Sequence, residues 1–432
     1  MPMKARQKRC EKEPFNQNKQ EGIIMTENIH QLAEQKGLVR AVAEKMVDLP
    51  VELNPPLLGS RMLIWKQDPS VKGIDLPRTV YIHTQVDDGP KDSQITIRGV
   101  PIVTPNSERD FLISPANEQA FDAVHTYTIV RQTLTMYQRV LGEKLGWQWN
   151  KSGNQDTIEV YPHAGETANA YYSRQEKALK FFYFTPTSPT ATSKVYTCRS
   201  LDIVAHEAGH AILDSLKPNW ISWSAPAQTG ALHEAFGDLT AIFLILSQLD
   251  QVEYIVAQTK ADLHQKNILA EMAEEFGTAI GRPQGLRNAD NDLKLSEVST
   301  EVHELSQVFS GAVFDILADL FAARRDPRVR DTAEVLYETG KYIAGLTIRA
   351  YMKAPDTNAT FADVANAMLE LAASDGASDC VSFIKKHFEF REVLGAKAVV
   401  GLVDLSNFGL YTNRRCTCGT MQHPEYKPKL SS

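Results

Sequence analysis

The sequence has few cysteines and no segment of the kind that exports a protein or holds it in a membrane. Its five cysteines are an odd number and lie far apart, so they do not make a disulfide framework and fit a reducing compartment better. No run of 18 apolar residues suggests a membrane span, and residues 1–25 lack the apolar core of a secretory signal. We therefore expect a cytoplasmic protein, with secretion by a non-standard route as the alternative.

The chain also has no excess of basic residues. The formal net charge is −7, the isoelectric point is near 5.9, and the charges are dispersed along the chain. Neither a nucleic acid nor an anionic membrane is expected as a partner. Apolar material is plentiful, because 43% of the 432 residues are hydrophobic, which is ample for a packed core and for two lobes. The sequence does not specify the oligomeric state.

Residues 200–214 carry the chemistry around which the rest of the chain is organised. Ser200 can cap a helix on which His206 and His210 lie four residues apart, so that both imidazoles can reach one atom. Glu207 follows the first histidine and can place its carboxylate beside that atom without binding it. This is the HExxH arrangement, with two nitrogen ligands for zinc and an adjacent general base. The alternative is a buried helix whose two histidines are satisfied by carbonyls or carboxylates.

A second apolar helix, expected after Pro226, favours the metal interpretation. Glu234 and Asp238 lie four residues apart on one of its faces. A catalytic zinc ion needs three protein ligands, and Glu234 can be the third. Asp238 can accept the outer N–H of a ligating histidine and so fix its tautomer. His233 points about 100° away from Glu234 on a helix, so we expect it to face elsewhere.

The chain resembles the thermolysin family of zinc metallopeptidases, the gluzincins, in which HExxH is followed by a helix carrying Glu-x-x-x-Asp. Further segments similar to the family occur in the family's order, at Asn169-Ala170, at Arg287 and at Val302-His303. The resemblance covers roughly residues 115–395. It implies that Asn169 and Ala170 hold the substrate backbone, that Arg287 binds a substrate carbonyl, and that His303 is a second catalytic histidine.

Two features of the family are missing here. The tyrosine that usually helps to bind the tetrahedral intermediate falls near Ala225, although Trp220 and Trp223 are close in sequence. The acidic run that builds the family's paired calcium site is replaced by the apolar residues 242–246. We therefore expect one catalytic zinc ion and no calcium.

A third departure concerns the partner of the second catalytic histidine. The aspartate that the family places five residues before this histidine is Val298 in this chain. Glu297 and Glu301 are the possible substitutes beside His303.

The remaining segments predict an α+β protein. Alternating apolar residues indicate strands at 61–65, 79–83, 94–98, 156–161 and 178–183. Apolar residues at helical spacing indicate helices from Ser114-Pro115 to about 142, and at 306–325, 332–353, 361–374 and 378–390. The resemblance implies a thermolysin-like, two-lobe metallopeptidase. Its β-rich N-terminal lobe and helical C-terminal lobe would enclose the zinc site in the cleft between them.

We divide the chain into five parts. They are a disordered N-terminal tail (1–25), an N-terminal helix and β-rich region (26–113), an N-terminal catalytic lobe with the HExxH helix (114–219), a helical C-terminal catalytic lobe (220–410) and a flexible tail (411–432). In the last part, Cys416, Cys418 and His423 lack Cys-x-x-Cys spacing, so a tail is preferred to a metal site.

These residues together predict a zinc-dependent metalloendopeptidase that acts on peptides or proteins. The family resemblance places Ile203 and Leu286 in a pocket that favours cleavage before an apolar residue. One alternative is an aminopeptidase of the same clan, which would need an acidic residue for the free amine that we cannot identify. The other is an inactive, zinc-stabilised binding or scaffold protein, against which stands Glu207, a residue that a structural zinc site does not need.

Overall fold

The structure is a computed structural model that describes residues 59–69, 71, 73–186, 194–222, 224–281 and 285–395. The predicted N-terminal tail, the predicted N-terminal helix, Trp223 and the predicted C-terminal tail lie outside the described residues. The division into parts at 113/114 and 219/220 therefore stays a prediction.

The N-terminal part of the described chain contains most of the strands. β1 (Ser60–Trp65) pairs antiparallel with β2 (Pro77–Ile82), with Ser60 opposite Ile82. A four-stranded sheet has the order β3 (Ile95–Ile97), β4 (Ile158–Tyr161), β6 (Ala178–Phe181), β5 (Ala170–Ser173). β3, β4 and β6 run parallel, and β5 is antiparallel at the edge. Two short pairs are β7 (Tyr183–Phe184) with β8 (Val195–Tyr196) and β9 (Glu271–Met272) with β10 (Arg287–Asn288).

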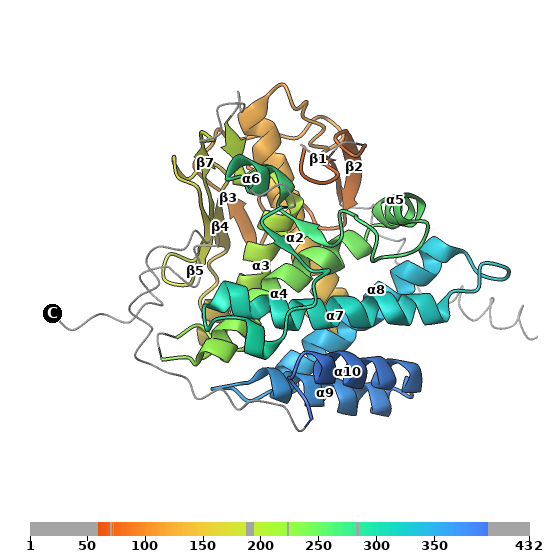
Figure 1. The fold of residues 1–432 in the computed structure, drawn as a ribbon. Coiled ribbons are helices and arrows are strands. Elements are labelled where there is room, and N and C mark those ends of the chain that lie inside the picture. The colour runs from red at the N-terminus through yellow and green to blue at the C-terminus, as the bar shows by residue number, and fades with distance from the viewer. Residues whose placement is uncertain are drawn as a thin grey trace, which may run out of the picture. The chain divides into compact units, whose positions relative to one another are not determined.

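The rest of the described chain is mainly helical. Its α-helices are α2 (Glu118–Leu141), α3 (Leu201–Leu216), α4 (Ala227–Leu246), α5 (Leu249–Thr259), α6 (Glu274–Ala279), α7 (Val302–Arg324), α8 (Thr332–Lys353), α9 (Phe361–Ser374) and α10 (Ser378–Phe390). Short 3-10 helices lie at η1 (Gln148–Ser152), η2 (Thr197–Arg199) and η3 (Leu295–Glu297). Most strands lie in the N-terminal half of the described chain and most helices in its C-terminal half, in a mixed α+β fold as predicted (Figure 1).

Two helix starts differ from the prediction, each for a local reason. α2 begins at Glu118, because Pro115 lies in a turn in which the Asn117 amide donates to the Ser114 carbonyl at 2.9 Å. α7 begins at Val302 rather than near Ser306, because the Glu301 carboxylate accepts hydrogen bonds from the amides of His303 and Glu304 and so caps the helix.

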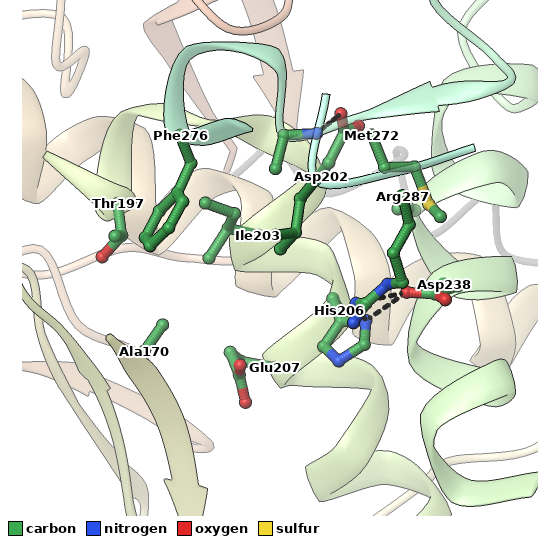
Figure 2. Close-up of a pocket in the computed structure, with 13 residues that line it drawn as sticks. Ala170, Thr197, Asp202, Ile203, His206, Glu207, Asp238, Met272, Phe276 and Arg287 are labelled. Carbon is green, nitrogen blue, oxygen red and sulfur yellow. Dashed lines mark hydrogen bonds and ion pairs between the residues drawn. The ribbon is translucent and has the colours of Figure 1, made fainter. Parts of the chain in front are cut away.

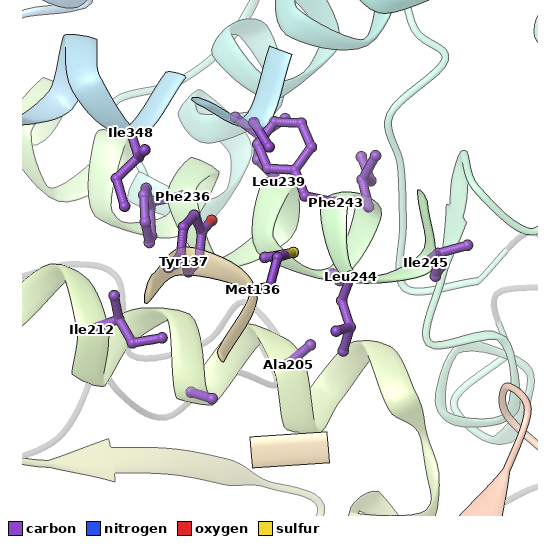
Figure 3. Close-up of a cluster of buried hydrophobic side chains, with 14 of the residues drawn as sticks. Met136, Tyr137, Ala205, Ile212, Phe236, Leu239, Phe243, Leu244, Ile245 and Ile348 are labelled. Carbon is purple, nitrogen blue, oxygen red and sulfur yellow. The ribbon is translucent and has the colours of Figure 1, made fainter. Parts of the chain in front are cut away.

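Helix α4 lies in the core of the protein. All of its residues except Gln228 are buried. In Figure 3 its side chains pack against α3, α2 and α8, the last represented by Ile348. By length and composition α4 and α7 could each cross a membrane, but 100% and 83% of their apolar windows are buried. They are core helices of this fold.

Glycine allows α3 and α4 to approach closely. A Cβ on Gly209 of α3 would lie 2.7 Å from Thr240 Oγ1, and one on Gly237 of α4 would lie 2.6 Å from the ring of His206. Distances this short do not occur with real side chains, so both positions require a residue without a Cβ. The contact between the two helices therefore depends on Gly209 and Gly237.

Candidate active site

Three side chains from α3 and α4 meet in the interior. His206 and His210 lie one turn apart on α3, Glu234 lies on α4, and all three are buried. His206 Nε2 is 3.4 Å from Glu234 Oε2, and His210 Nε2 is 3.6 Å from Glu234 Oε1. One ligand atom from each residue lies within 4.8 Å of the other two.

These separations fit ligands around a shared zinc ion. Two atoms that are each about 2.0–2.1 Å from zinc, at a tetrahedral angle, lie about 3.3 Å apart. The observed distances of 3.4 and 3.6 Å are near that value and are longer than an ordinary N–H···O hydrogen bond. Two imidazoles and one carboxylate are also the donor set of a catalytic zinc site, which keeps a fourth position open.

The protonation states of these side chains suit a metal ligand. Burial holds the pKa of His210 well below its usual value, so its imidazole is neutral. Burial alone would raise the pKa of Glu234, but the neighbouring imidazoles of His303, His210 and His206 hold that pKa well below its usual value. A neutral imidazole and an ionised carboxylate are the forms that bind a metal ion.

Asp238 and Arg287 lie on the outer side of His206. Asp238 Oδ1 is 2.9 Å from His206 Nδ1, and it accepts a hydrogen bond from Arg287 Nη2 at 2.6 Å (Figure 2). A proton held on Nδ1 by a carboxylate leaves Nε2 available for a metal. Asp238 thus contacts Nδ1 of His206, the outer ring nitrogen, as predicted. Arg287, from β10, contacts the same carboxylate.

The expectation that His233 faces away from the site is wrong. Its Nδ1 lies 2.7 Å from Nδ1 of His210, and the two rings stack with their centroids 4.8 Å apart. Burial lowers the pKa of His233 to about 3, so the ring is neutral and can accept the proton of His210 Nδ1. Adjacent residues of a helix point about 100° apart, but α3 lies so close to α4 that His233 and Glu234 both contact it. The sequence feature that could have identified His233 as part of the site is that it is a single histidine in an otherwise mostly apolar helix.

His303 approaches the group from α7. Its Nε2 lies 3.4 Å from Glu234 Oε1, and its Nδ1 lies 2.5 Å from Glu301 Oε1. Burial would raise the pKa of Glu301, but the hydrogen bond and charge of His303 hold it below its usual value. Of the two candidate substitutes for the family's aspartate, Glu301 makes the contact. Glu297 is exposed and instead accepts a hydrogen bond from the Lys294 amide at 3.1 Å.

A narrow cavity opens beside His206 and Glu207. Its free space is about 30 Å³, and Glu207 is 1% exposed in its wall. The sequence-predicted residues Ala170, Ile203, Leu286, Asp238 and Arg287 also line it. Side chains that the sequence did not suggest complete the apolar part, namely Ala241, Met272 and Phe276 (Figure 2).

Asn169, the substrate-binding residue predicted next to Ala170, does not line this cavity, and neither do His210, Glu234 and His303. Its side-chain oxygen accepts a hydrogen bond from the Ala170 amide at 2.9 Å. Its carbonyl accepts one from the Phe182 amide at 3.3 Å. Ala170 itself begins the edge strand β5. The structure therefore brings the strand edge to the site, with the Asn169 side chain bonded locally.

A carboxyl group that the sequence analysis did not consider, that of Asp202, lines the cavity, and Glu274 and Glu275 belong to the neighbouring helix α6. Asp202 accepts hydrogen bonds from Gln67 Nε2 at 2.9 and 3.0 Å and from the Ala273 amide at 3.2 Å. Burial raises its pKa to about 7. Burial, together with nearby carboxylates, raises the pKa of Glu274 to about 10 and that of Glu275 to about 8. The expectation of no calcium considered residues 242–246, whereas these carboxyls come from other segments.

The protein thus has a mixed α+β fold with a buried HExxH…E group that is compatible with a zinc ion. No family model matches the chain, and no curated protein matches it. Among solved structures it is similar to the precursor of protealysin, a metalloproteinase from Serratia proteamaculans. The identity is 13%, the TM-score is 0.43, and the match covers 72% of this chain and 90% of that chain. A likeness of this size carries no argument about function, which has to come from the residues of the site.

Proposed function

We propose that the protein is a zinc-dependent metalloendopeptidase. The observation that carries the proposal is the buried group of His206, His210 and Glu234 with Glu207 in the wall of the adjoining cavity. A structural zinc site is closed by four protein ligands and has no use for a neighbouring carboxylate that is not a ligand. This arrangement has three ligands and such a carboxylate.

His206, His210 and Glu234 would hold the ion. When bound, zinc supplies Lewis acidity, which polarises a carbonyl group and lowers the pKa of water. The remaining chemistry belongs to the side chains around it.

Glu207 acts as the general base. It takes a proton from the attacking water and passes it to the leaving nitrogen. His303, oriented by Glu301, donates a hydrogen bond to the substrate carbonyl oxygen as negative charge builds on it. This assigns the stabilising role to a histidine in a chain that lacks the family's tyrosine.

The substrate is a peptide bound in extended form. The edge strand β5 can pair with such a chain through its backbone, beginning at Ala170. The Asn169 side chain would hold the peptide backbone once it gives up its hydrogen bond from the Ala170 amide, and Arg287 would offer one of its N–H groups to a carbonyl on the leaving side. Ile203 and Leu286 line the cavity together with other apolar side chains, which favours a small apolar residue after the cleaved bond.

The test is hydrolysis of a quenched-fluorescent peptide library by protein of known zinc content, with Glu207→Gln as the matched control. We expect internal cleavage by the wild type and turnover lower by about 10²-fold or more in the variant, with equal zinc content. Equal activity in the variant would refute the mechanism. Cleavage confined to free N-termini would favour the aminopeptidase, and full zinc without hydrolysis would favour the scaffold.

We also propose a cytoplasmic location. It is supported by the free, buried Cys198 and Cys380 among the described residues, which need no oxidising compartment. Detection of the protein in the culture medium rather than in the cell extract would contradict this proposal.

A further inference from the structure

A second and much larger cavity lies away from the zinc site. It is formed by β2 and the following residues, α2, the end of α4, and α8. Its free space is about 470 Å³, against about 30 Å³ for the cavity beside Glu207. Ligand pockets are usually about 300–1,000 Å³, so the larger cavity has the size of a site for a small molecule.

The wall of this second cavity is basic at its rim and apolar at its floor. His83, Arg139 and Lys341 line it and are exposed, whereas no aspartate or glutamate is among the described residues that line it. Within the described residues, no ion pair joins Arg139 or Lys341 to a carboxylate. Met136 and Phe243, buried side chains of α2 and α4, form part of the floor. The whole chain has a net charge of −7, whereas the described residues that line this cavity include three basic groups and no acid. The charge at the cavity is therefore opposite in sign to that of the whole chain.

Two polar groups of residues in this wall have incomplete hydrogen bonding. The Tyr81 hydroxyl and Gln132 Oε1 are buried and have no hydrogen-bond partner among the described residues. Nearly all buried polar atoms in proteins have a partner. These two atoms are shielded from the open space of the cavity, so a ligand would reach them only if the Tyr81 or Gln132 side chain turned.

We propose that this cavity binds a small amphipathic anion, with its acidic head at Arg139 and Lys341 and its apolar body over Met136 and Phe243. A carboxylate or phosphate head would gain charge-assisted hydrogen bonds at the rim. An aliphatic or aromatic body would displace water from the floor. The site shares no residue with the zinc group, so the proposal stands independently of the hydrolytic activity.

The first experiment titrates the full-length protein with 8-anilinonaphthalene-1-sulfonate, a fluorescent amphipathic anion. We expect saturation near one equivalent, with affinity at least tenfold weaker in the double variant Arg139→Glu, Lys341→Glu. The matched control is Arg330→Glu, which reverses a charge on an exposed residue outside the cavity. Unchanged affinity in the double variant, or equal weakening in the control, would overturn the proposal.

A second measurement separates the head from the body of the ligand. Decanoate and decyl phosphate should displace the dye from the wild type at least tenfold more effectively than decanol, and the better of the two identifies the preferred head. In the double variant, whose rim carries two carboxylates, decanol should displace the dye at least as effectively as the two anions. Equal displacement by decanol and the anions in the wild type would show that the rim does not recognise charge, and would refute the site as described.

Discussion

The two histidines that would bind zinc have different kinds of partner at their Nδ1 atoms. His206 faces the carboxylate of Asp238, whereas His210 faces the neutral ring of His233. A carboxylate can be inferred from a Glu-x-x-x-Asp spacing. A histidine partner can be found only when the helices are placed together, which is why sequence reasoning assigned Asp238 and missed His233.

Removing His233 should weaken zinc binding without moving the ligands. His233→Leu keeps the volume roughly constant and removes the acceptor for His210 Nδ1, so we expect about 10–100-fold weaker zinc binding. His233→Asn, which can still accept a hydrogen bond, should retain more of the affinity. Competition with a fluorescent chelator measures both constants, and identical affinities for the Leu variant and the wild type would refute this role.

Changing His303 should affect turnover rather than zinc content. His303→Ala removes a hydrogen-bond donor to the developing oxyanion, so we expect kcat to fall by about 10²–10³-fold. Glu301→Gln should give a smaller loss, because it weakens the orientation of the ring and the cap of α7 but leaves the histidine in place. Elemental analysis and steady-state kinetics on the same samples are the measurements. Loss of zinc from His303→Ala would mean that this histidine is a metal ligand.

At the scale of elements, boundaries were predictable where they depend on local signals. Helices α8, α9 and α10 occupy the predicted ranges, with Asp331 and Thr360 as caps of the first two. The start of α7 was missed because its cap, Glu301, had been considered only as a partner of His303. One carboxylate serves both purposes.

The closeness of α3 and α4 gives a direct test of how the site is positioned. Gly237→Ala would place a methyl group 2.6 Å from the His206 ring, so the ring or the helix must shift. We expect a loss of about 1–3 kcal/mol in the free energy of unfolding together with reduced zinc content. Urea unfolding and elemental analysis measure the two effects.

Gly345→Ala is the matched control for this substitution. Gly345 lies in α8, and its added Cβ would meet Val140 at an ordinary 3.5 Å. Because alanine favours a helix by up to about 1 kcal/mol over glycine, the control should be neutral or slightly stabilising. If both variants behave alike, close helix contact is not what positions His206.

At the scale of the whole molecule, the fold class followed from the sequence, whereas α5, α6 and the short strands β9 and β10 were not predicted. The sheet order did not follow from the sequence either, because β5 and β6 reverse their sequence order in the sheet and β3 pairs with a strand some 60 residues later. Periodicity identifies strands but carries no information about such distant partners. The interaction between the Asp202 and Glu274 carboxyl groups could not be predicted for the same reason, because these two residues belong to distant segments.

These carboxyl groups predict that stability falls as pH rises. The pKa values of Asp202, Glu275 and Glu274 are raised to about 7, 8 and 10 in the folded state, from ordinary values of 3.8 and 4.5. The folded protein therefore binds more protons than the unfolded chain above about pH 4, and it loses stability until the folded pKa values are passed. Below about pH 6.5 the lowered pKa values of His210 and His233 act in the opposite direction, so the midpoint of thermal unfolding should decrease between pH 7 and pH 9.

Glu274→Gln removes one of these acids and keeps its shape. Its midpoint should fall less steeply with pH than that of the wild type, and an identical slope would contradict the assignment. Adding calcium chloride at pH 9 tests the separate expectation that no calcium binds. An unchanged midpoint agrees with it, whereas a rise would mean that a cation replaces the lost protons.

The glycine contact between α3 and α4 also sets an order of events during maturation. A single turn of α3 can offer His206 and His210 to a metal early, but Glu234 arrives only when α4 has settled against it. An incompletely folded chain therefore competes for zinc with two ligands at most, and the third is gained together with the core. Tight retention of the ion would accordingly mark chains that have finished folding, so metal exchange rates would distinguish finished molecules from unfinished ones.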